Sequence, residues 1–361
     1  MFDQKHYVPV LKGRNGEYGA LQVMSPGVKA RLTPILEVPP IPWNYKEEQP
    51  AKTIDAHLQR VSSKIRKSWG DERPLFVDLQ WIPESEQMSD GRHPMTCVFD
   101  TARQAGLQLV PVIGLVREDH REACCEVIAR DGRGVCLRLQ REDFAEPGLD
   151  EQVAALLDTL GVSAVDTDLI LDLRALNSAE IATLVTTVPA FIRSVPLIKR
   201  WRSFAMTATG FPENLIGLTP SAPSSIPRLE WTLWRSVIAG GRTLPRLPVF
   251  GDYAIAHPQP SEVDPRIMRP SASIRYTTSN TWLILKGRNL RDYGYEEFHE
   301  VSRQLIRRPE YSGPQFSWAD RHIQDCAHER TGTGNLMTWR KVGTSHHLAF
   351  VTDQLANASW T

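Results

Sequence analysis

Short apolar runs, each ending near a polar residue and a loop, recur along the whole chain. Their length and their Val, Ile and Leu content are typical of strands buried on both faces, as in a parallel sheet. The runs are Tyr7–Leu11, Pro34–Val38, Leu75–Leu79, Leu109–Leu115, Val135–Leu139, Leu169–Leu173, Phe204–Thr209 and Leu247–Ala254.

Stretches with helical spacing separate most of these runs. In Thr53–Ser68, for example, Ile54, Leu58, Val61 and Ile65 fall on one stripe. The alternation predicts an α/β fold, a (β/α)8 TIM-like parallel barrel. An open doubly wound sheet is the alternative, although the glycine-rich fingerprint of such sheets is absent. The other predicted helices are Met95–Ala105, His120–Arg130, Asp150–Leu160, Ser178–Thr187 with Ser178 as N-cap, and Leu229–Ala239.

The pattern changes after Ala254. A hairpin is predicted from Ser273–Thr277 and Trp282–Lys286, followed by helices over Tyr295–Arg307, Trp318–Glu329 and from near Ser345 to Leu355. We therefore expect residues 1–256 to form the barrel. Residues 257–361 should form a C-terminal elaboration of hairpin and helices that packs on the barrel and is not an independent domain. Two long proline-rich loops, 211–228 and 257–273, are where ligands of a barrel are usually contacted.

Charged residues appear where the apolar runs end. In a closed barrel they would converge on the mouth at the carboxyl ends of the strands, where active sites of this fold lie. A buried charge persists only if it is paired, hydrated or bound to a ligand. The residues are Lys12, Glu37, Asp78, Arg138, Asp172 with Arg174 on the same face, and Asp252.

Two interpretations of these charges remain open. Lys12 and Arg138 could neutralise two of the four acids in an internal salt-bridge network. The unmatched acids could instead form a functional polar pocket. Four carboxylates could hold a divalent metal such as Mg²⁺ or Mn²⁺ through oxygen ligands, or supply an acid and a base. The sequence does not decide whether the protein is an enzyme.

Two further clusters are candidate anion sites. Arg275, Lys286 and Arg288 lie on the predicted hairpin among aromatic residues, a composition that suits a phosphate-bearing or single-stranded ligand. A solvated arginine-rich surface would look the same. His346 and His347 open the predicted last helix after Thr344 and Ser345, which favours either an anion site at a helix N-terminus or simple capping.

Composition excludes several classes of function. Among 361 residues, 42 Lys and Arg balance 42 Asp and Glu, so nothing in the overall charge favours nucleic acid or membrane. Five cysteines without a CxxC pair indicate reduced thiols in a reducing cytosol. No signal peptide and no apolar run of about 20 residues occurs, so we expect a soluble, cytoplasmic protein without membrane contact. P-loop, HExxH and GxSxG motifs are also absent.

The chain resembles the phage-type "beta protein" family over essentially its whole length. The similarity rests on Tyr7-Val-Pro-Val-Leu-Lys12, on Pro34-Ile-Leu-Glu37, on Phe250-Gly-Asp252-Tyr253, on Ile274-Arg-Tyr-Thr277 and on Trp339-Arg340 with His346-His347-Leu348. The resemblance implies a setting in phage genomes or phage-defence neighbourhoods. It implies no mechanism.

Two hypotheses of function follow. In the first, the barrel mouth binds a nucleotide or nucleic-acid segment and catalyses metal-assisted phosphodiester hydrolysis. Glu37, Asp78, Asp172 and Asp252 would hold the metal, and Arg275, Lys286 or Arg288 the phosphate. In the second, the protein is a non-catalytic sensor or adaptor of an anti-phage system that binds a phage component or a partner protein. An exposed patch around Trp282 and Trp318 would favour the second hypothesis.

Overall fold

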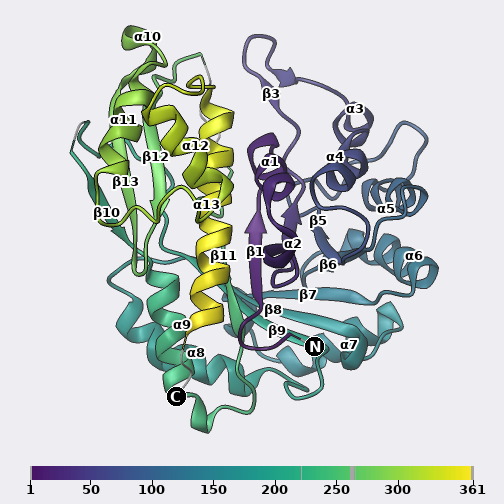
Figure 1. Ribbon diagram of the computed structural model, residues 1–361. Coiled ribbons are helices and arrows are strands. Elements are labelled where there is room, and N and C mark those ends of the chain that lie inside the picture. Colours follow the sequence, from purple (N-terminus) through teal and green to yellow (C-terminus); the bar gives the residue numbers. More distant parts are fainter. Residues whose placement is uncertain (1, 221, 261–263, 265, 359–361) are drawn as a thin grey trace.

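Eight parallel strands close into a barrel in the computed structural model, which describes residues 2–220, 222–260, 264 and 266–358 (Figure 1). The first strand pairs with the second on one side and with the last on the other, so the barrel prediction is confirmed and the open-sheet alternative is wrong. In barrel order the strands are β1 (Tyr7–Leu11), β2 (Ile35–Glu37), β5 (Leu75–Asp78), β6 (Leu109–Ile113), β7 (Val135–Gln140), β8 (Thr167–Ala175), β9 (Ser203–Thr209) and β11 (Val249–Asp252).

Both faces of the barrel strands are buried, which explains why the strands appear as continuous apolar runs. One set of alternate residues, including Val8, Ile35 and Phe76, fills the barrel interior. The other set, including Leu36 and Val77, packs against the surrounding helices. Because side chains alternate along a strand, the residue that ends each strand has a predetermined face.

Helices cover the outside of the barrel. The predicted single helix Thr53–Ser68 is two helices, interrupted at Gln59 and Arg60. The predicted N-cap Ser178 is wrong, because the helix begins after Glu180 and continues to Ser194. The helices are α1 (Asn15–Val23), α2 (Pro26–Lys29), α3 (Ile54–Leu58), α4 (Val61–Ser68), α5 (Pro94–Gln104), α6 (Arg121–Asp131), α7 (Leu149–Leu160), α8 (Ile181–Ser194) and α9 (Leu229–Ala239), with 3-10 turns at Glu118–His120, Glu142–Phe144, Ala164–Asp166 and Gly241–Thr243.

The C-terminal part forms a second layer beside the barrel. The predicted hairpin is present as β12 (Ser271–Thr277) and β13 (Thr281–Asn289), and β10 (Ser224–Pro227), from a segment predicted to be loop, adds a third antiparallel strand. This sheet packs against α11 (Glu297–Ile306) and α12 (Trp318–Ala327), with the short α10 (Leu290–Tyr293) next to it. A separate small hairpin, β3 (Trp43–Asn44) with β4 (Gln49–Pro50), projects at the top of Figure 1.

The last helix, α13 (Leu336–Asn357), joins the two layers (Figure 1). It begins at a capping box formed by Asn335 and Thr338, so the prediction that it starts near Ser345 is wrong. Val342 belongs to the C-terminal core, whereas Leu348 and Val351 belong to the barrel core. The division of the chain at residue 256 stays a prediction. In the part of the chain that the structure describes, no helix is both long and apolar enough to cross a membrane.

Candidate anion-binding site at the barrel mouth

The strand-ending aspartates form the same local turn at three places. Oδ1 of Asp78, Asp172 and Asp252 each accepts a hydrogen bond from the backbone N–H two residues later. Such Asx turns redirect the chain: they lie at the ends of β5 and β11 and, in β8, where the register shifts between Asp172 and Ala175. Arg174 and Ala254, which donate two of these bonds, have positive φ angles of 56° and 54°. The recurring acid at the strand ends therefore has a structural reason that does not depend on a ligand.

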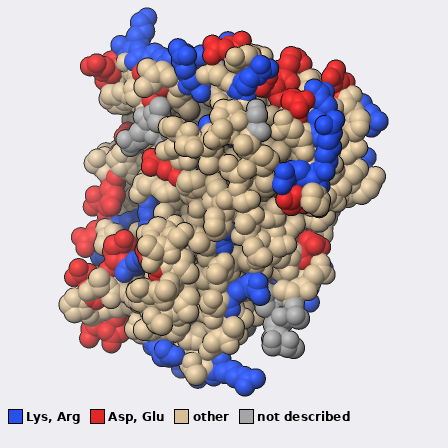
Figure 2. Space-filling view, turned by 90° about the vertical axis from the view of Figure 1, so that its left-hand side faces the viewer, with Lys and Arg blue, Asp and Glu red and all other residues tan. Residues whose placement is uncertain are grey.

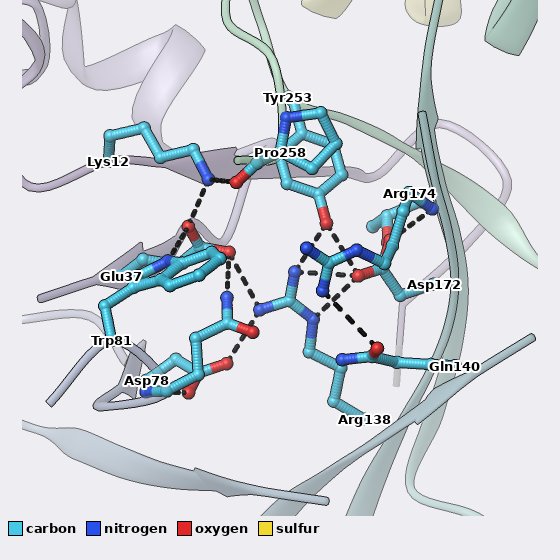
Figure 3. A network of polar contacts seen from close by, with 12 residues as sticks. Lys12, Glu37, Asp78, Trp81, Arg138, Gln140, Asp172, Arg174, Tyr253 and Pro258 are labelled. Atoms are coloured by element: carbon cyan, nitrogen blue, oxygen red, sulfur yellow. Dashed lines mark hydrogen bonds and ion pairs between the residues drawn. The ribbon is translucent and has the colours of Figure 1, made fainter. Parts of the chain in front are cut away.

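Arg138 occupies the centre of the barrel mouth and binds three carboxylates (Figure 3). Its Nη1 donates to Glu37 at 2.9 Å and to Asp78 at 2.7 Å, and its Nη2 donates to Asp172 at 2.8 Å. The hydroxyl of Tyr253 accepts from Arg138 and donates to Asp172, both at 2.6 Å. The sequence prediction that Glu37, Asp78, Arg138 and Asp172 converge is therefore confirmed.

Two more cations complete this cluster. Lys12 donates to Glu37 at 2.5 Å, and Arg117 donates to Asp78 at 2.6 Å. Burial alone would raise the pKa of Asp78, but Arg117 and Arg138 outweigh burial and hold that pKa below its usual value. Burial lowers the pKa of Lys12, and its ion pair with Glu37 partly offsets this effect.

Three cations thus face three carboxylates in what we call the ion network: Lys12, Glu37, Asp78, Arg117, Arg138 and Asp172. The expectation of unmatched acids fails because Arg117, which follows the fourth apolar run rather than lying in it, supplies the missing charge. Among the described residues, no group of three or more His, Cys, Asp or Glu side chains is placed to hold a metal ion. The carboxylates of the mouth therefore do not fit the metal site considered for Mg²⁺ or Mn²⁺.

Asp252 does not face the barrel interior with the other acids. Its carboxylate binds Tyr7 and, at 2.9 Å, Nε2 of His347, on the side of the barrel wall that α13 covers. The interior position at this strand end belongs to the next residue, Tyr253. The predicted convergence is therefore wrong for Asp252, because the register of β11 points its side chain outward.

The two histidines lie within α13 and not at its start. His346 and His347 are both fully buried. His346 contacts Asp320 at 3.1 Å and the Thr277 carbonyl at 2.9 Å, while His347 contacts Asp252 and the Thr277 hydroxyl. The predicted anion site at a helix N-terminus is wrong, since both residues serve as buried connections between the two layers.

The predicted basic hairpin is not an open cationic surface. Nζ of Lys286 donates to the carbonyls of Leu215 and Leu218, and Arg288 pairs with Glu297 at 2.5 Å. On the face that lies to the left in Figure 1, charged side chains of both signs lie mostly around a largely uncharged centre (Figure 2). Of the three predicted cations of the hairpin, only Arg275 lines the barrel mouth. The patch considered around Trp282 and Trp318 is absent as well, because Trp282 is fully buried and Trp318 is only partly exposed.

A pocket above the ion network contains cations that have no carboxylate partner. Arg275 and Arg340 both direct Nη1 at the Ile255 carbonyl, at 2.9 and 3.4 Å. Glu17 also lines this pocket, but within the described residues neither arginine forms an ion pair. Burial, and after it the charge of Arg340, lowers the pKa of Arg275 well below its ordinary value, although the carboxylate of Glu17 opposes this shift.

This mouth pocket has a volume of about 70 Å³. Lys12 and Arg14 lie on its wall, and the rings of Trp81 and Phe211 border it. Trp81 and Gln259 also line a neighbouring, more open pocket of about 480 Å³. That second pocket presents amides and charged groups, namely Gln80, Gln140, Arg174, Arg117, Glu84 and Glu142.

Several residues of the mouth escaped sequence reasoning. Tyr253 follows Asp252 directly, and only the register of β11 decides which of the two faces inward. Arg340 appears in the sequence as a cation preceding a helix, whereas it lies on the second turn of α13. Arg14 stands just past the end of β1 and could have been found by extending the search beyond each run.

Comparisons with known proteins bear on the whole chain and not on the site. A family model described as "Beta protein" matches residues 7–353, from the start of β1 into the last turns of α13. A comparison with curated proteins gave no match. The match covers the ion network and the mouth pocket alike, so it does not select one of them as functional.

Proposed function

The chain belongs to the Beta protein family, and for this member we propose the binding of a phosphate-bearing ligand, a nucleotide or the end of a nucleic acid, in the mouth pocket. The observation that carries the proposal is the pair Arg275 and Arg340, two neighbouring guanidinium groups that form no ion pair with a described residue, although Glu17 lines the same pocket and acts on Arg275 from a distance. A charged guanidinium group matches phosphate oxygens in two-pronged hydrogen bonds, and a bound phosphate would favour the charged form. A phosphoryl group would supply the missing negative charge.

The two pockets could hold different parts of such a ligand. The small mouth pocket, of about 70 Å³, suits a small anionic group such as a phosphoryl group, because Arg275 and Arg340 line it. The adjoining larger pocket offers the amides of Gln80 and Gln140 for the polar edges of a base or sugar, with Trp81 between the two pockets. This arrangement fits a mononucleotide or the terminal nucleotide of a strand.

The proposal is binding and not hydrolysis. Metal-assisted hydrolysis would need the carboxylates of Glu37, Asp78, Asp172 and Asp252 to act together. Three of them are engaged by protein cations, and Asp252 lies on the other face of the barrel wall. The cations, rather than the acids, therefore define the proposed site.

Thermal unfolding with added sodium pyrophosphate tests the proposal. Pyrophosphate should raise the Tm of the wild-type protein, because a ligand that binds only the folded state stabilises it. In Arg275→Met the shift should disappear, whereas Arg200→Met, which removes an exposed arginine elsewhere, should keep it. An equal shift in wild type and Arg275→Met would refute the mouth pocket as the site.

A role in phage defence is a further part of the proposal and rests on the family resemblance. A sensor needs ligand binding without turnover, and this requirement is what the mouth pocket is proposed to meet. Cells that express the wild-type protein should then resist phage, and cells that express Arg275→Met at the same level should not. Equal plaque counts with both proteins would show that the mouth pocket has no role in phage defence.

A further inference from the structure

A hollow of about 770 Å³, here called the side groove, lies next to the mouth pocket. Its walls are the loop after β1 with α1, the segment from Val38 to Tyr45 that leads into the β3–β4 hairpin, and helices α3 and α4. Arg14, Pro39 and Pro40 line both the side groove and the mouth pocket. The two hollows therefore adjoin, so that an extended ligand in one can reach the other.

The charged side chains of the side groove are all cationic. Arg14, Lys52, Arg60 and Lys64 line it, and no Asp or Glu does. None of the four forms an ion pair with a residue that the structure describes. Four cations without counter-charge in one hollow indicate a polyanionic ligand.

These cations are close enough to affect one another. The pKa of Lys64 is lowered by burial and then by the charges of Lys52 and Arg60. Burial also lowers the pKa of His57, and Lys52 and Lys64 add to that effect. An anion bound between them would relieve this repulsion, whereas a neutral ligand would not.

The rest of the lining is aromatic and rigid. Trp43 on the β3–β4 hairpin is 50% exposed, which is unusual for so large an apolar side chain. Pro39, Pro40 and Pro42 form part of the wall. Proline has a fixed φ and no N–H to donate, so this wall is preorganised and offers few hydrogen bonds that could distinguish one base from another.

We infer that the side groove binds single-stranded nucleic acid, with bases stacked on Trp43, phosphates near Lys52 and Arg60, and one end of the strand directed toward the mouth pocket. Only this last element rests on the proposed function. Stacking platforms combined with a cationic track are the general means of binding single strands without sequence preference. An acidic peptide would use the same cations but would gain little from an exposed indole, so the aromatic residue favours nucleic acid.

Fluorescence anisotropy with labelled 12-nucleotide oligo(dT) and oligo(U) tests the inference. Both strands should bind the wild-type protein, and affinity should fall as salt rises, because each neutralised phosphate releases counterions. Trp43→Ala should weaken binding roughly tenfold through lost stacking, and Trp43→Phe should restore most of it. The double variant Lys52→Ala/Arg60→Ala should weaken binding by a similar factor and flatten the salt dependence.

Matched controls make the outcomes decisive. Lys199→Ala/Arg200→Ala removes two exposed cations outside the groove and should leave affinity unchanged. An equal loss in this control, or equal binding of a 12-base-pair duplex or an oligoglutamate peptide, would overturn the inference. A pyrophosphate-induced Tm shift without oligonucleotide binding would overturn the groove alone. Oligonucleotide binding that needs Trp43 but not Arg275 would uphold the groove and count against the mouth pocket.

Discussion

The barrel mouth contains two sets of charges that differ in how they are paired: a buried ion network and a half-buried pair of arginines. In the ion network every carboxylate has a cation within 3.0 Å, and Arg138 alone binds three of them. In the mouth pocket above it, Arg275 and Arg340 share one backbone carbonyl and have no carboxylate. The paired charges are balanced within the protein, whereas the two arginines can still take up an anionic ligand. A site is therefore better located by unpaired cations than by conspicuous acids.

The largest effect should follow from Arg138→Met. The variant keeps most of the side-chain volume but leaves Glu37, Asp78 and Asp172 without their common partner. Removing one member of a buried ion pair costs about 3–5 kcal/mol, so the free energy of unfolding should fall by at least this amount. Urea denaturation followed by circular dichroism measures it. An unchanged free energy of unfolding would show that the ion network does not stabilise the fold.

Glu230→Gln tests a buried ion pair that is longer than those of the ion network. Glu230 is fully buried, and among the residues that the structure describes it forms one ion pair, with Arg228 at 3.4 Å. Burial raises the pKa of Glu230 to about 7, although Arg228 opposes the shift.

The folded protein therefore holds this proton more tightly than the unfolded chain between about pH 4.5 and 7. The contribution of Glu230 to stability is consequently lost as the pH rises through that window. Relative to wild type, Glu230→Gln should gain about 3 kcal/mol between pH 4.5 and 8. Urea denaturation of both proteins at several pH values measures this gain. A difference in stability that does not change with pH would contradict the assignment.

Arg275→Met should behave unlike Arg138→Met. Because Arg275 forms no ion pair with a residue that the structure describes, its removal breaks no such salt bridge; it relieves the repulsion from Arg340 and gives up the weaker attraction of Glu17. We expect the free energy of unfolding to stay the same or to rise by about 1 kcal/mol. The urea experiment used for Arg138→Met gives the answer. A loss as large as that of Arg138→Met would erase the distinction between the two sets of charges.

Asn335→Ala serves as a control for variants that lose stability without losing binding. Asn335→Ala removes the N-cap of α13, the helix that carries Arg340. Loss of such a cap costs about 1 kcal/mol. The Tm should fall slightly, and the affinity for pyrophosphate should stay the same. If affinity falls in proportion to Tm, then the effects of the mouth variants report stability rather than binding.

The eight apolar runs and the helical stretches between them were enough to predict the barrel. All eight apolar runs became its strands, and the convergence of Glu37, Asp78, Arg138 and Asp172 followed from closure. The face of Asp252 was not predictable, since it depends on how β11 is registered against β1 and β9.

The mouth pocket and the side groove were harder still to predict. Arg275 comes from the second sheet, Arg340 from α13 and Arg14 from the loop after β1. No periodicity within the sequence relates these three positions. The predicted start of α13 near Ser345 was also wrong, because the N-cap is Asn335, ten residues earlier.

The contact between His347 and Tyr7 joins residues 340 positions apart in the chain. During synthesis β1 leaves the ribosome long before β11 and α13 have been made. Until then one edge of β1 has no partner strand, and the hydroxyl of Tyr7 has no contact with His347. Contacts of such high sequence separation slow folding and prolong the exposure of apolar strands. We therefore expect the newly made chain to depend on protection from aggregation until its C-terminal helix emerges.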